Sequence, residues 1–418
     1  MKLLESWVSS ANSPDTDFPL NNLPYGVFST KTTDPRCGVA IGNMIFDCRA
    51  AEKEELVGLT RGAAFDLPSW NKFMQLGPIA WEKLRKRLIN LLNKNAKHQA
   101  QLSKFLTPMS DAKLHLPFTV AEYTDFYSSR NHATNVGKIL RGEENALPAN
   151  WFYIPIAYNG RSSSVVVSGT DVRRPWGQSK FQHAAKPHFM PTCKFDFELE
   201  LGAIVGSSSN GPLNLHEADD MIFGYVILND WSARDFQAWE YQPLGPFQAK
   251  ATATTISPWI VTKAALEPFR CEPPKREIEL LEHLKDQGPM MYDIELQISL
   301  ATQGNAACKI SATNYREVYY SSAQQLAHHS AAGCPMNSGD LLGSGTISGK
   351  VNKEFGSMLE LSYGGKAPLE LNGGIQRGFL EDGDRVEMTG CARGDNFKIG
   401  FGHCSGTVIP ALKDPYAR

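Results

Sequence analysis

The sequence predicts a mainly β, α+β protein with a small N-terminal barrel domain, residues 1–117, and a large C-terminal β domain, residues 118–418. Three observations support this fold class. Segments rich in Val, Ile, Phe and Tyr recur between Gly, Pro, Asn and Ser clusters from about residue 116 to residue 412. Few helical patterns lie between them, so the βαβ crossovers of a doubly wound sheet are missing. With 418 residues, the chain also exceeds the size at which one core stops growing.

The N-terminal domain shows one hairpin and one amphipathic helix. Short strand patterns at 37–41 and 44–48 flank Gly42-Asn43, a Gly-first pair that suits a type II′ turn. Gly77-Pro78 then opens a helical segment whose apolar residues recur at a spacing of three to four: Trp81, Leu84, Leu88, Leu91 and Leu92. We expect this helix to pack on the core through that face, with its basic residues in solvent.

The C-terminal domain is predicted from recurring strand patterns. The clearest of them span residues 163–168, 195–205, 222–229, 292–300, 358–363 and 385–390.

Composition and charge limit the function classes. The chain has 42% hydrophobic and 21% charged residues, with 42 basic against 44 acidic side chains, so no charge excess points to nucleic acid. Neither a secretory leader nor an apolar run of spanning length is evident, and the eight cysteines form no C-x-x-C pair. The H-E-x-x-H and G-x-S-x-G motifs are absent as well. We therefore expect a soluble cytoplasmic protein without nucleic-acid or membrane partners.

An acidic alternation occupies residues 195–201, with the sequence FDFELEL. As a strand it places Asp196, Glu198 and Glu200 on one face and apolar residues on the other. Neighbours on one face lie about 6.5–7 Å apart, close enough for two carboxylates to converge on one cation. The alternative is a half-exposed strand with a solvated acidic face, and the pattern leaves both open.

A polar stripe begins where the strand pattern 222–229 ends. Asp230 suits the N-cap of a helix, and Arg234, Gln237 and Tyr241 follow at i+4, i+7 and i+11, on one helical face. An acid, a guanidinium, an amide and a phenol together favour recognition of a ligand. A capped helix with an exposed polar face remains the alternative.

A histidine follows a third polar segment. Asp125 and Tyr127 share the face of a predicted strand, a turn or helix starts near residue 128, and His132 comes shortly after. Histidine is the side chain best suited to accept a proton near pH 7, but it needs an orienting partner. Glu360, in an otherwise apolar stretch, is the candidate. A structural histidine and a solvent-facing Glu360 are the alternatives.

Lys250 is the single charged residue in the loop 244–259. A surface lysine is the default interpretation for this residue type. A partner for a developing oxyanion is the more specific one.

Six motifs occur in an order that resembles the fumarylacetoacetate hydrolase family. They are DFYSSR with HATN (125–135), FELE (197–200), LNDWSARD (228–235), LGPF (244–247), GTISG (345–349) and FGSMLE (355–360). LPYGVFS at 23–29 is similar to the full-length eukaryotic-type members, whereas the shorter bacterial relatives share only the catalytic domain.

The resemblance implies an SH3-like N-terminal barrel, a mixed β-sandwich-roll catalytic domain and a homodimer. The implied reaction is hydrolysis of a carbon–carbon bond in 4-fumarylacetoacetate, a β-diketo acid, to fumarate and acetoacetate, the last step of tyrosine and phenylalanine breakdown. A related oxo-acid hydrolase of the acylpyruvase type, a decarboxylase or isomerase of the same superfamily, and a non-catalytic binding protein are the alternatives.

The resemblance also assigns roles to residues. His132 is the implied base, oriented by Glu360, and Arg234, Gln237 and Lys250 are the implied stabilisers of negative charge. The implied ligands of a catalytic Ca²⁺ are Asp125, Glu198, Glu200 and Asp230, an oxygen-only set that suits a hard cation. A structural Mg²⁺ is implied around Asp230, Lys250 and Thr254. The implied substrate contacts are Tyr127, Arg141, Tyr158, Gln237, Tyr241 and Thr346.

Overall fold

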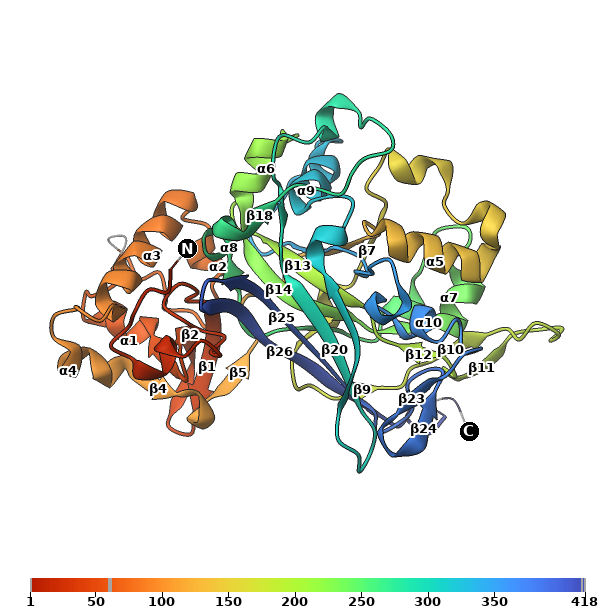
Figure 1. Cartoon of the computed structure of the whole chain (residues 1–418), viewed down its shortest axis with the longest axis horizontal. Coiled ribbons are helices and arrows are strands. Elements are labelled where there is room, and N and C mark those ends of the chain that lie inside the picture. The colour runs from red at the N-terminus through yellow and green to blue at the C-terminus, as the bar shows by residue number, and fades with distance from the viewer. Residues whose placement is uncertain (1, 59–61, 415, 417–418) are drawn as a thin grey trace.

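The computed structural model describes residues 2–58, 62–414 and 416, and it is mostly β, as the sequence predicts (Figure 1). The N-terminal part, red and orange in Figure 1, is a five-stranded antiparallel sheet in the order β4 (Leu106–Pro108), β3 (Met44–Asp47), β2 (Thr33–Ile41), β1 (Tyr25–Thr30) and β5 (Lys113–His115). The predicted hairpin is confirmed, because β2 and β3 pair on either side of Gly42, whose φ of 57° suits the first turn residue. The predicted helix is α3 (Pro78–Leu92), which buries Leu84, Leu88 and Leu92.

Two larger sheets form the rest of the molecule. The first is a mixed eight-stranded sheet in the order β7 (Ala157–Asn159), β6 (Tyr123–Phe126), β22 (Leu341–Gly343), β13 (Leu199–Val205), β14 (Ile222–Asp230), β16 (Thr254–Ile256) and β8 (Val165–Val167), with β17 (Val261–Thr262) also paired to β14. The second has the order β21 (Cys308–Asn314), β20 (Glu295–Ala301), β25 (Arg385–Gly394), β26 (Phe397–Ile409) and β9 (Val172–Arg173).

The central strands β13 and β14 of the eight-stranded sheet are buried on both faces. Along β14, Tyr225 and Ile227 belong to the core shared with β20, β25 and β26. Val226 and Leu228 belong to a second core, which the N-terminal sheet and α3 complete. Any carboxylate that these strands carry is therefore removed from water and requires a compensating partner.

Three helices gather near one end of this sheet, on the right of Figure 1: α5 (Arg130–Arg141), α7 (Arg234–Glu240) and α10 (Met358–Leu361). The remaining helices are α1 (Cys48–Lys53), α2 (Asn71–Met74), α4 (Gln99–Leu102), α6 (Leu215–Met221), α8 (Lys263–Leu266) and α9 (Ser322–Ser330). Two-stranded pairs are β10 (Trp176–Ser179) with β11 (His188–Pro191), β12 (Phe195–Asp196) with β15 (Ser232–Ala233), β18 (Arg270–Cys271) with β19 (Met291–Tyr292), and β23 (Leu369–Leu371) with β24 (Ile375–Arg377). Across the described ranges, every helix is too short or too polar to cross a membrane.

Two sequence predictions of local structure are wrong. Residues 358–363 were expected to form a strand, but α10 occupies Met358–Leu361 because the Ser357 side chain caps it through the Glu360 N–H. Asp230 was expected to cap a helix, but β14 continues through Asp230 and α7 begins only at Arg234, after Ala233. Pairing with β16 keeps Asp230 extended, so sheet contacts override its preference for a cap.

Two strand predictions need new bounds. The alternation at 195–205 is interrupted, because β12 ends at Asp196 and β13 begins at Leu199. The predicted strand 292–300 is likewise two pieces, β19 and β20, separated by Asp293 and Ile294. Asp196 and Glu198 therefore do not belong to one continuous strand, although both contact Arg234.

Candidate active site

One cavity of about 360 Å³ collects most of the predicted site residues. Those that line it are Asp125, Tyr127, His132, Arg141, Tyr158, Glu198, Glu200, Arg234, Gln237, Tyr241, Lys250 and Thr346. The other three, Asp230, Thr254 and Glu360, are buried behind its wall. Its remaining lining is largely apolar, with Val136, Leu140 and Ile156 among the side chains.

Four carboxylates converge at the cavity, three in its lining and Asp230 buried beside them. Asp125, Glu198, Glu200 and Asp230 each offer an oxygen that lies within 4.8 Å of the others. They come from β6, the β12–β13 link, β13 and the end of β14, strands that the eight-stranded sheet brings together. All four are buried, which excludes a solvated acidic strand face.

A glycine makes this convergence possible. Gly343 in β22 lies between Asp125 of β6 and Gly202 of β13 in the strand pairing. A Cβ at Gly343 would approach Asp125 Oδ1 to 2.6 Å and Glu200 Oε2 to 2.9 Å. The missing side chain therefore leaves the space that these two carboxylates occupy.

The cluster carries more negative charge than its protein partners balance. Burial, followed by the charge of Asp230, raises the pKa of Asp125 well above its usual range. Burial and the charges of Asp125 and Asp230 do the same for the pKa of Glu200. Asp125 Oδ1 and Glu200 Oε1 are buried and lack hydrogen-bond partners among the described residues. A cation in this cluster would relieve both the repulsion and the unsatisfied oxygens.

Two cationic side chains neutralise Glu198. Burial alone would raise its pKa, but Arg234, Lys250 and His132 outweigh that effect and hold the pKa below the ordinary value. Arg234 Nη2 lies 2.7 Å from Glu198 Oε1, and Lys250 Nζ donates to Glu198 Oε2. Glu198 therefore stays ionised more readily than Asp125 and Glu200, whose pKa values are raised.

Lys250 is buried, so the default interpretation of a surface lysine is wrong. Its Nζ also lies 2.7 Å from Asp230 Oδ2, which accepts a 2.7 Å hydrogen bond from the Tyr158 hydroxyl as well. Thr254 Oγ1 lies 3.4 Å from Asp230 Oδ1. Although burial opposes the charge, Asp230 and Glu198 raise the pKa of Lys250, so the side chain is an ammonium.

His132 sits in the first turn of α5 and is 3% exposed. Its Nδ1 lies 2.7 Å from Glu360 Oε2, and its Nε2 lies 3.8 Å from Glu198 Oε1. A carboxylate partner places the proton on Nδ1 and leaves the Nε2 lone pair facing the cavity. The fold thus brings together His132 and Glu360, which were predicted as a pair although they lie 228 positions apart in the sequence.

Three polar residues that the sequence analysis did not single out hold Glu360. Asn135 donates to Oε1 at 2.9 Å, and Ser348 and Ser357 donate to Oε2 at 2.9 and 2.8 Å. Burial opposes ionisation of Glu360, but His132, Asn135 and Ser357 outweigh it and lower the pKa. Asn135 and Ser348 lie inside quoted motifs, yet no spacing rule pairs them with Glu360.

The polar stripe of α7 borders the cavity, but without Asp230. Arg234 donates from Nε to Asp196 Oδ2 at 2.8 Å and from Nη1 to Gln237 Oε1 at 3.0 Å. Gln237 and Tyr241 follow on the same face and line the cavity. Arg141, from α5, lines it as well, and its Nε and Nη2 donate to the carbonyls of residues 145 and 146.

Comparison with known proteins assigns the chain to a family. The family model described as "Fumarylacetoacetate (FAA) hydrolase C-terminal" matches residues 122–409, and "Fumarylacetoacetase N-terminal" matches residues 21–117. The chain belongs to the fumarylacetoacetate hydrolase family. Curated relatives named fumarylacetoacetase include those of Arabidopsis thaliana, 44% identical over 98% of this chain and 100% of the relative, and of Homo sapiens, 47% identical over 95% and 97%.

Solved structures of low sequence identity share the fold of this fumarylacetoacetate hydrolase family member. A fumarylacetoacetate hydrolase from Exiguobacterium antarcticum aligns with a TM-score of 0.53 at 16% identity, covering 93% of this chain and 99% of that one. A maleylpyruvate hydrolase from Sphingobium sp. SYK-6 aligns with a TM-score of 0.51 at 17% identity, covering 93% and 100%.

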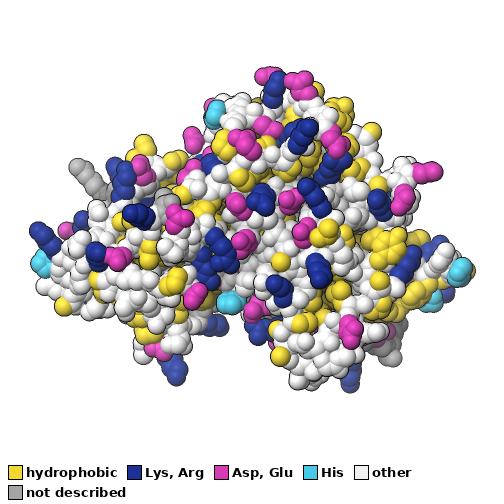
Figure 2. Space-filling model, in the orientation of Figure 1, with side chains coloured by type: hydrophobic (Ala, Val, Ile, Leu, Met, Phe, Trp, Pro, Cys, Tyr) yellow, Lys and Arg dark blue, Asp and Glu magenta, His cyan; other side chains and the backbone are white. Residues whose placement is uncertain are grey.

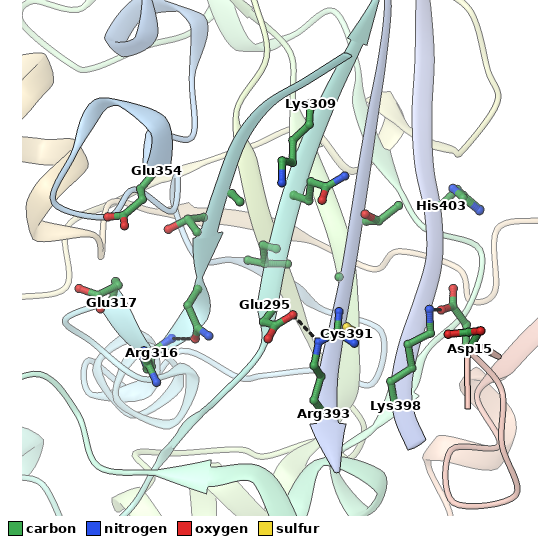
Figure 3. A pocket seen from close by; sticks show the side chains of 18 residues that line it. Asp15, Glu295, Lys309, Arg316, Glu317, Glu354, Cys391, Arg393, Lys398 and His403 are labelled. Atoms are coloured by element: carbon green, nitrogen blue, oxygen red, sulfur yellow. Dashed lines mark hydrogen bonds and ion pairs between the residues drawn. The ribbon is translucent and has the colours of Figure 1, made fainter. Parts of the chain in front are cut away.

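A second hollow, of about 800 Å³, lies away from the cavity of this family member, over β20, β21, β25 and β26 (Figure 3). Its charges are largely paired across the surface: Arg393 Nε lies 2.6 Å from Glu295 Oε2, and Lys398 Nζ lies 2.9 Å from Asp17 Oδ1. Basic and acidic side chains intermingle over the face shown in Figure 2. The hollow therefore lacks the buried, unbalanced carboxylates that mark the cavity.

Proposed function

We propose that this chain hydrolyses 4-fumarylacetoacetate to fumarate and acetoacetate, the last step of tyrosine and phenylalanine catabolism. One observation supports this most: His132, paired with the buried Glu360, lines the same cavity as Asp125, Glu198 and Glu200 of the four-carboxylate cluster. The curated relatives that share nearly the full length of the chain carry the name of this enzyme. The chain is thus a hydrolase that acts on a ketonic carbon–carbon bond.

His132 activates the attacking water. With Nδ1 bound to Glu360, Nε2 accepts the proton from a water while the water oxygen forms a bond to the ketone carbon of the fumaryl group, the one attached to the carbon–carbon double bond. The bond that breaks joins this carbon to the methylene between the two carbonyls. Its electron pair leaves with the methylene as an enolate, and the proton held on Nε2 can return to that carbon to give the methyl group of acetoacetate.

Lys250, Arg234 and Gln237 stabilise the negative charge that develops. All three line the cavity, and the two cations are fixed by buried carboxylates. Donors held in place in this way cost no reorganisation when the charge appears. Removal of one such donor typically costs about 100- to 1000-fold in kcat.

The four-carboxylate cluster fits a Ca²⁺ ion. The set is oxygen-only, as hard cations prefer, and its unpartnered oxygens and raised pKa values fit a site that a cation completes. Bound there, Ca²⁺ would act as a Lewis acid and template for the diketone oxygens. We also propose a structural Mg²⁺ beside Asp230, Lys250 and Thr254. Only Asp230 and Thr254 could supply ligand oxygens, because a lysine ammonium has no lone pair.

The rest of the cavity suits the substrate. Tyr127, Tyr158 and Tyr241 contribute rings and hydroxyls, and Thr346 has a buried hydroxyl without a partner among the described residues. Arg141 places a guanidinium in the lining, where it could pair with a substrate carboxylate. We assign these five residues and Gln237 to substrate binding.

We further propose that the protein is a cytoplasmic homodimer and that its N-terminal five-stranded sheet is an SH3-like barrel. The resemblance in sequence supports both, and short antiparallel strands in the N-terminal part suit a small barrel. The same resemblance suggests the division at residue 117. Light scattering of the purified protein would test the dimer.

A substrate assay tests the function. Purified protein should consume fumarylacetoacetate, measured as loss of the substrate's absorbance, and a chelator should stop the reaction until Ca²⁺ is restored. An acylpyruvate is the comparison substrate, because a related oxo-acid hydrolase would prefer it. A protein that binds Ca²⁺ but turns over neither substrate would refute the enzyme assignment.

A further inference from the structure

Asp196 is the carboxylate of the acidic segment that stays outside the four-carboxylate cluster. It is fully buried in β12, and it does not line the cavity. Four donors converge on it. Oδ2 accepts from Arg234 Nε at 2.8 Å and from the Leu359 N–H at 2.9 Å, while Oδ1 accepts from the Met358 and Phe197 N–H groups, both at 2.8 Å.

These bonds join two parts of the site. Arg234 reaches on from Asp196 to Glu198, at 2.7 Å, and to Gln237. Met358 and Leu359 form the start of α10, the short helix that carries Glu360 and therefore fixes the His132 imidazole. One carboxylate thus touches both the support of the base and the guanidinium at the cavity wall.

We propose that Asp196 is a positioning residue for the reaction, acting through Arg234 on the charge-stabilising side and through α10 and Glu360 on the base. The inference rests on the proposed function. It also explains how α10 is held in place. A four-residue helix is marginal by itself, so acceptors outside the helix are needed for its first N–H groups if Glu360 is to keep its position.

An asparagine at position 196 cannot reproduce these contacts. The carboxylate oxygens face donors only, so an amide must turn its NH₂ group either toward Arg234 and Leu359 or toward Met358 and Phe197. In either orientation the amide NH₂ faces an N–H donor, and the repulsion displaces either Arg234 or the start of α10. Displacement of reacting groups by about 1 Å can cost about 100-fold in rate.

The test compares Asp196→Asn with a matched control, Asp384→Asn. Asp384 is also fully buried, and it accepts from Arg377 Nε and from the Glu381 N–H, both at 2.8 Å, but away from the cavity. We expect Asp196→Asn to lower kcat about 100-fold, with KM and the affinity for Ca²⁺ alone changed less than about threefold. Asp384→Asn should lower the melting temperature similarly and leave kcat near that of the parent protein. Equal kcat values in the two variants would overturn the proposal.

A double variant separates positioning from general destabilisation. If Asp196 acts partly through Glu360, adding Asp196→Asn to Glu360→Gln should lower kcat by less than the product of the two single effects. A full multiplicative loss would contradict the coupling. If Asp196→Asn yields no folded protein, Asp196→Glu, which keeps the charge and shifts the oxygens by one methylene, replaces it, with Asp384→Glu as control.

A crystal structure of the Asp196 variant keeps this inference distinct from the proposed function. The distance between His132 Nδ1 and Glu360 Oε2 should lengthen from 2.7 Å, whether or not fumarylacetoacetate is the substrate. An unchanged distance, together with an unmoved Arg234, would overturn the role of Asp196 even in an active enzyme. Failure of the parent protein to turn over fumarylacetoacetate would instead refute the proposed function.

Discussion

The His132 imidazole lies between two carboxylates that have different roles. Glu360 holds Nδ1 at 2.7 Å, and Glu198 lies 3.8 Å from Nε2, inside the cavity. We predict that His132→Ala lowers kcat by about 100- to 10,000-fold, the usual contribution of a general base, with Ca²⁺ affinity retained. Glu360 keeps its bonds from Asn135, Ser348 and Ser357, so the variant should still fold. His329→Ala, at a half-buried histidine outside the cavity lining, is the control, and near-normal turnover by His132→Ala would refute the assigned base.

A second prediction concerns Lys250. Lys250→Met removes the cation that pairs with Asp230 and Glu198, so both buried carboxylates lose a partner. We expect kcat to fall about 100-fold or more and the protein without metal to lose stability. Lys263→Met, at a partly buried ion pair with Asp219, is the matched control. Steady-state kinetics and thermal melting of both variants check this, and equal kcat values would contradict it.

Candidate site residues could be predicted from the sequence where they lie in the motifs, but their burial and their contacts could not. The resemblance implied Asp125, Glu198, Glu200 and Asp230 as ligands, and in the structure an oxygen of each lies within 4.8 Å of the others. Burial of Lys250 was hidden, because its loop carries only small neutral neighbours and its partners lie 20 and 52 positions away. Local sequence patterns do not predict contacts between residues so far apart in the chain.

At the scale of elements, strand order builds the site and one glycine leaves room for it. We predict that Gly343→Ala weakens Ca²⁺ binding at least about tenfold, because its Cβ would press on Asp125 Oδ1 and Glu200 Oε2. Gly211→Ala, where a Cβ meets nothing within 4 Å, is the control. Calorimetric titration of both variants would decide, and unchanged affinity in Gly343→Ala would show that these carboxylates do not bind the ion.

The elements that the sequence mispredicted are those that tertiary contacts decide. The segment 358–361 (MLEL) was predicted to be a strand, yet Ser357 and Asp196 accept its first N–H groups and hold it as a helix. Asp230 is a good capping residue, yet pairing with Thr254 keeps it in β14. The hairpin at Gly42 and the helix α3 were predictable because turn chemistry and apolar spacing act locally.

At the scale of the whole molecule, the carboxylate cluster links metal, pH and stability. Burial and mutual repulsion raise the pKa values of Asp125 and Glu200 above 3.8 and 4.5. The folded state therefore holds protons that the unfolded state has released, and stability falls as pH rises from these values toward the raised ones. We predict that the melting temperature in chelator decreases with rising pH and that Ca²⁺ removes the decrease. In chelator, Glu200→Gln should make the melting temperature depend less on pH. A melting temperature of the parent protein that does not fall as pH rises would contradict this prediction.

The two halves of the molecule contribute differently to function. The N-terminal sheet completes the core on one face of β14, and the other face packs on β20, β25 and β26. This double burial is what makes four adjacent carboxylates costly and a bound cation favourable. Sequence alone predicted a β-rich chain in two parts, but not that the two parts share one core.

The role of the four-carboxylate cluster can be tested by calcium titration of chelator-treated protein, followed in parallel by calorimetry and by fumarylacetoacetate turnover. We predict that turnover rises with occupancy of the ion site and that Asp125→Asn loses binding and turnover together. Full turnover by metal-free protein, or undiminished Ca²⁺ affinity in Asp125→Asn, would show that the cluster does not hold a catalytic ion.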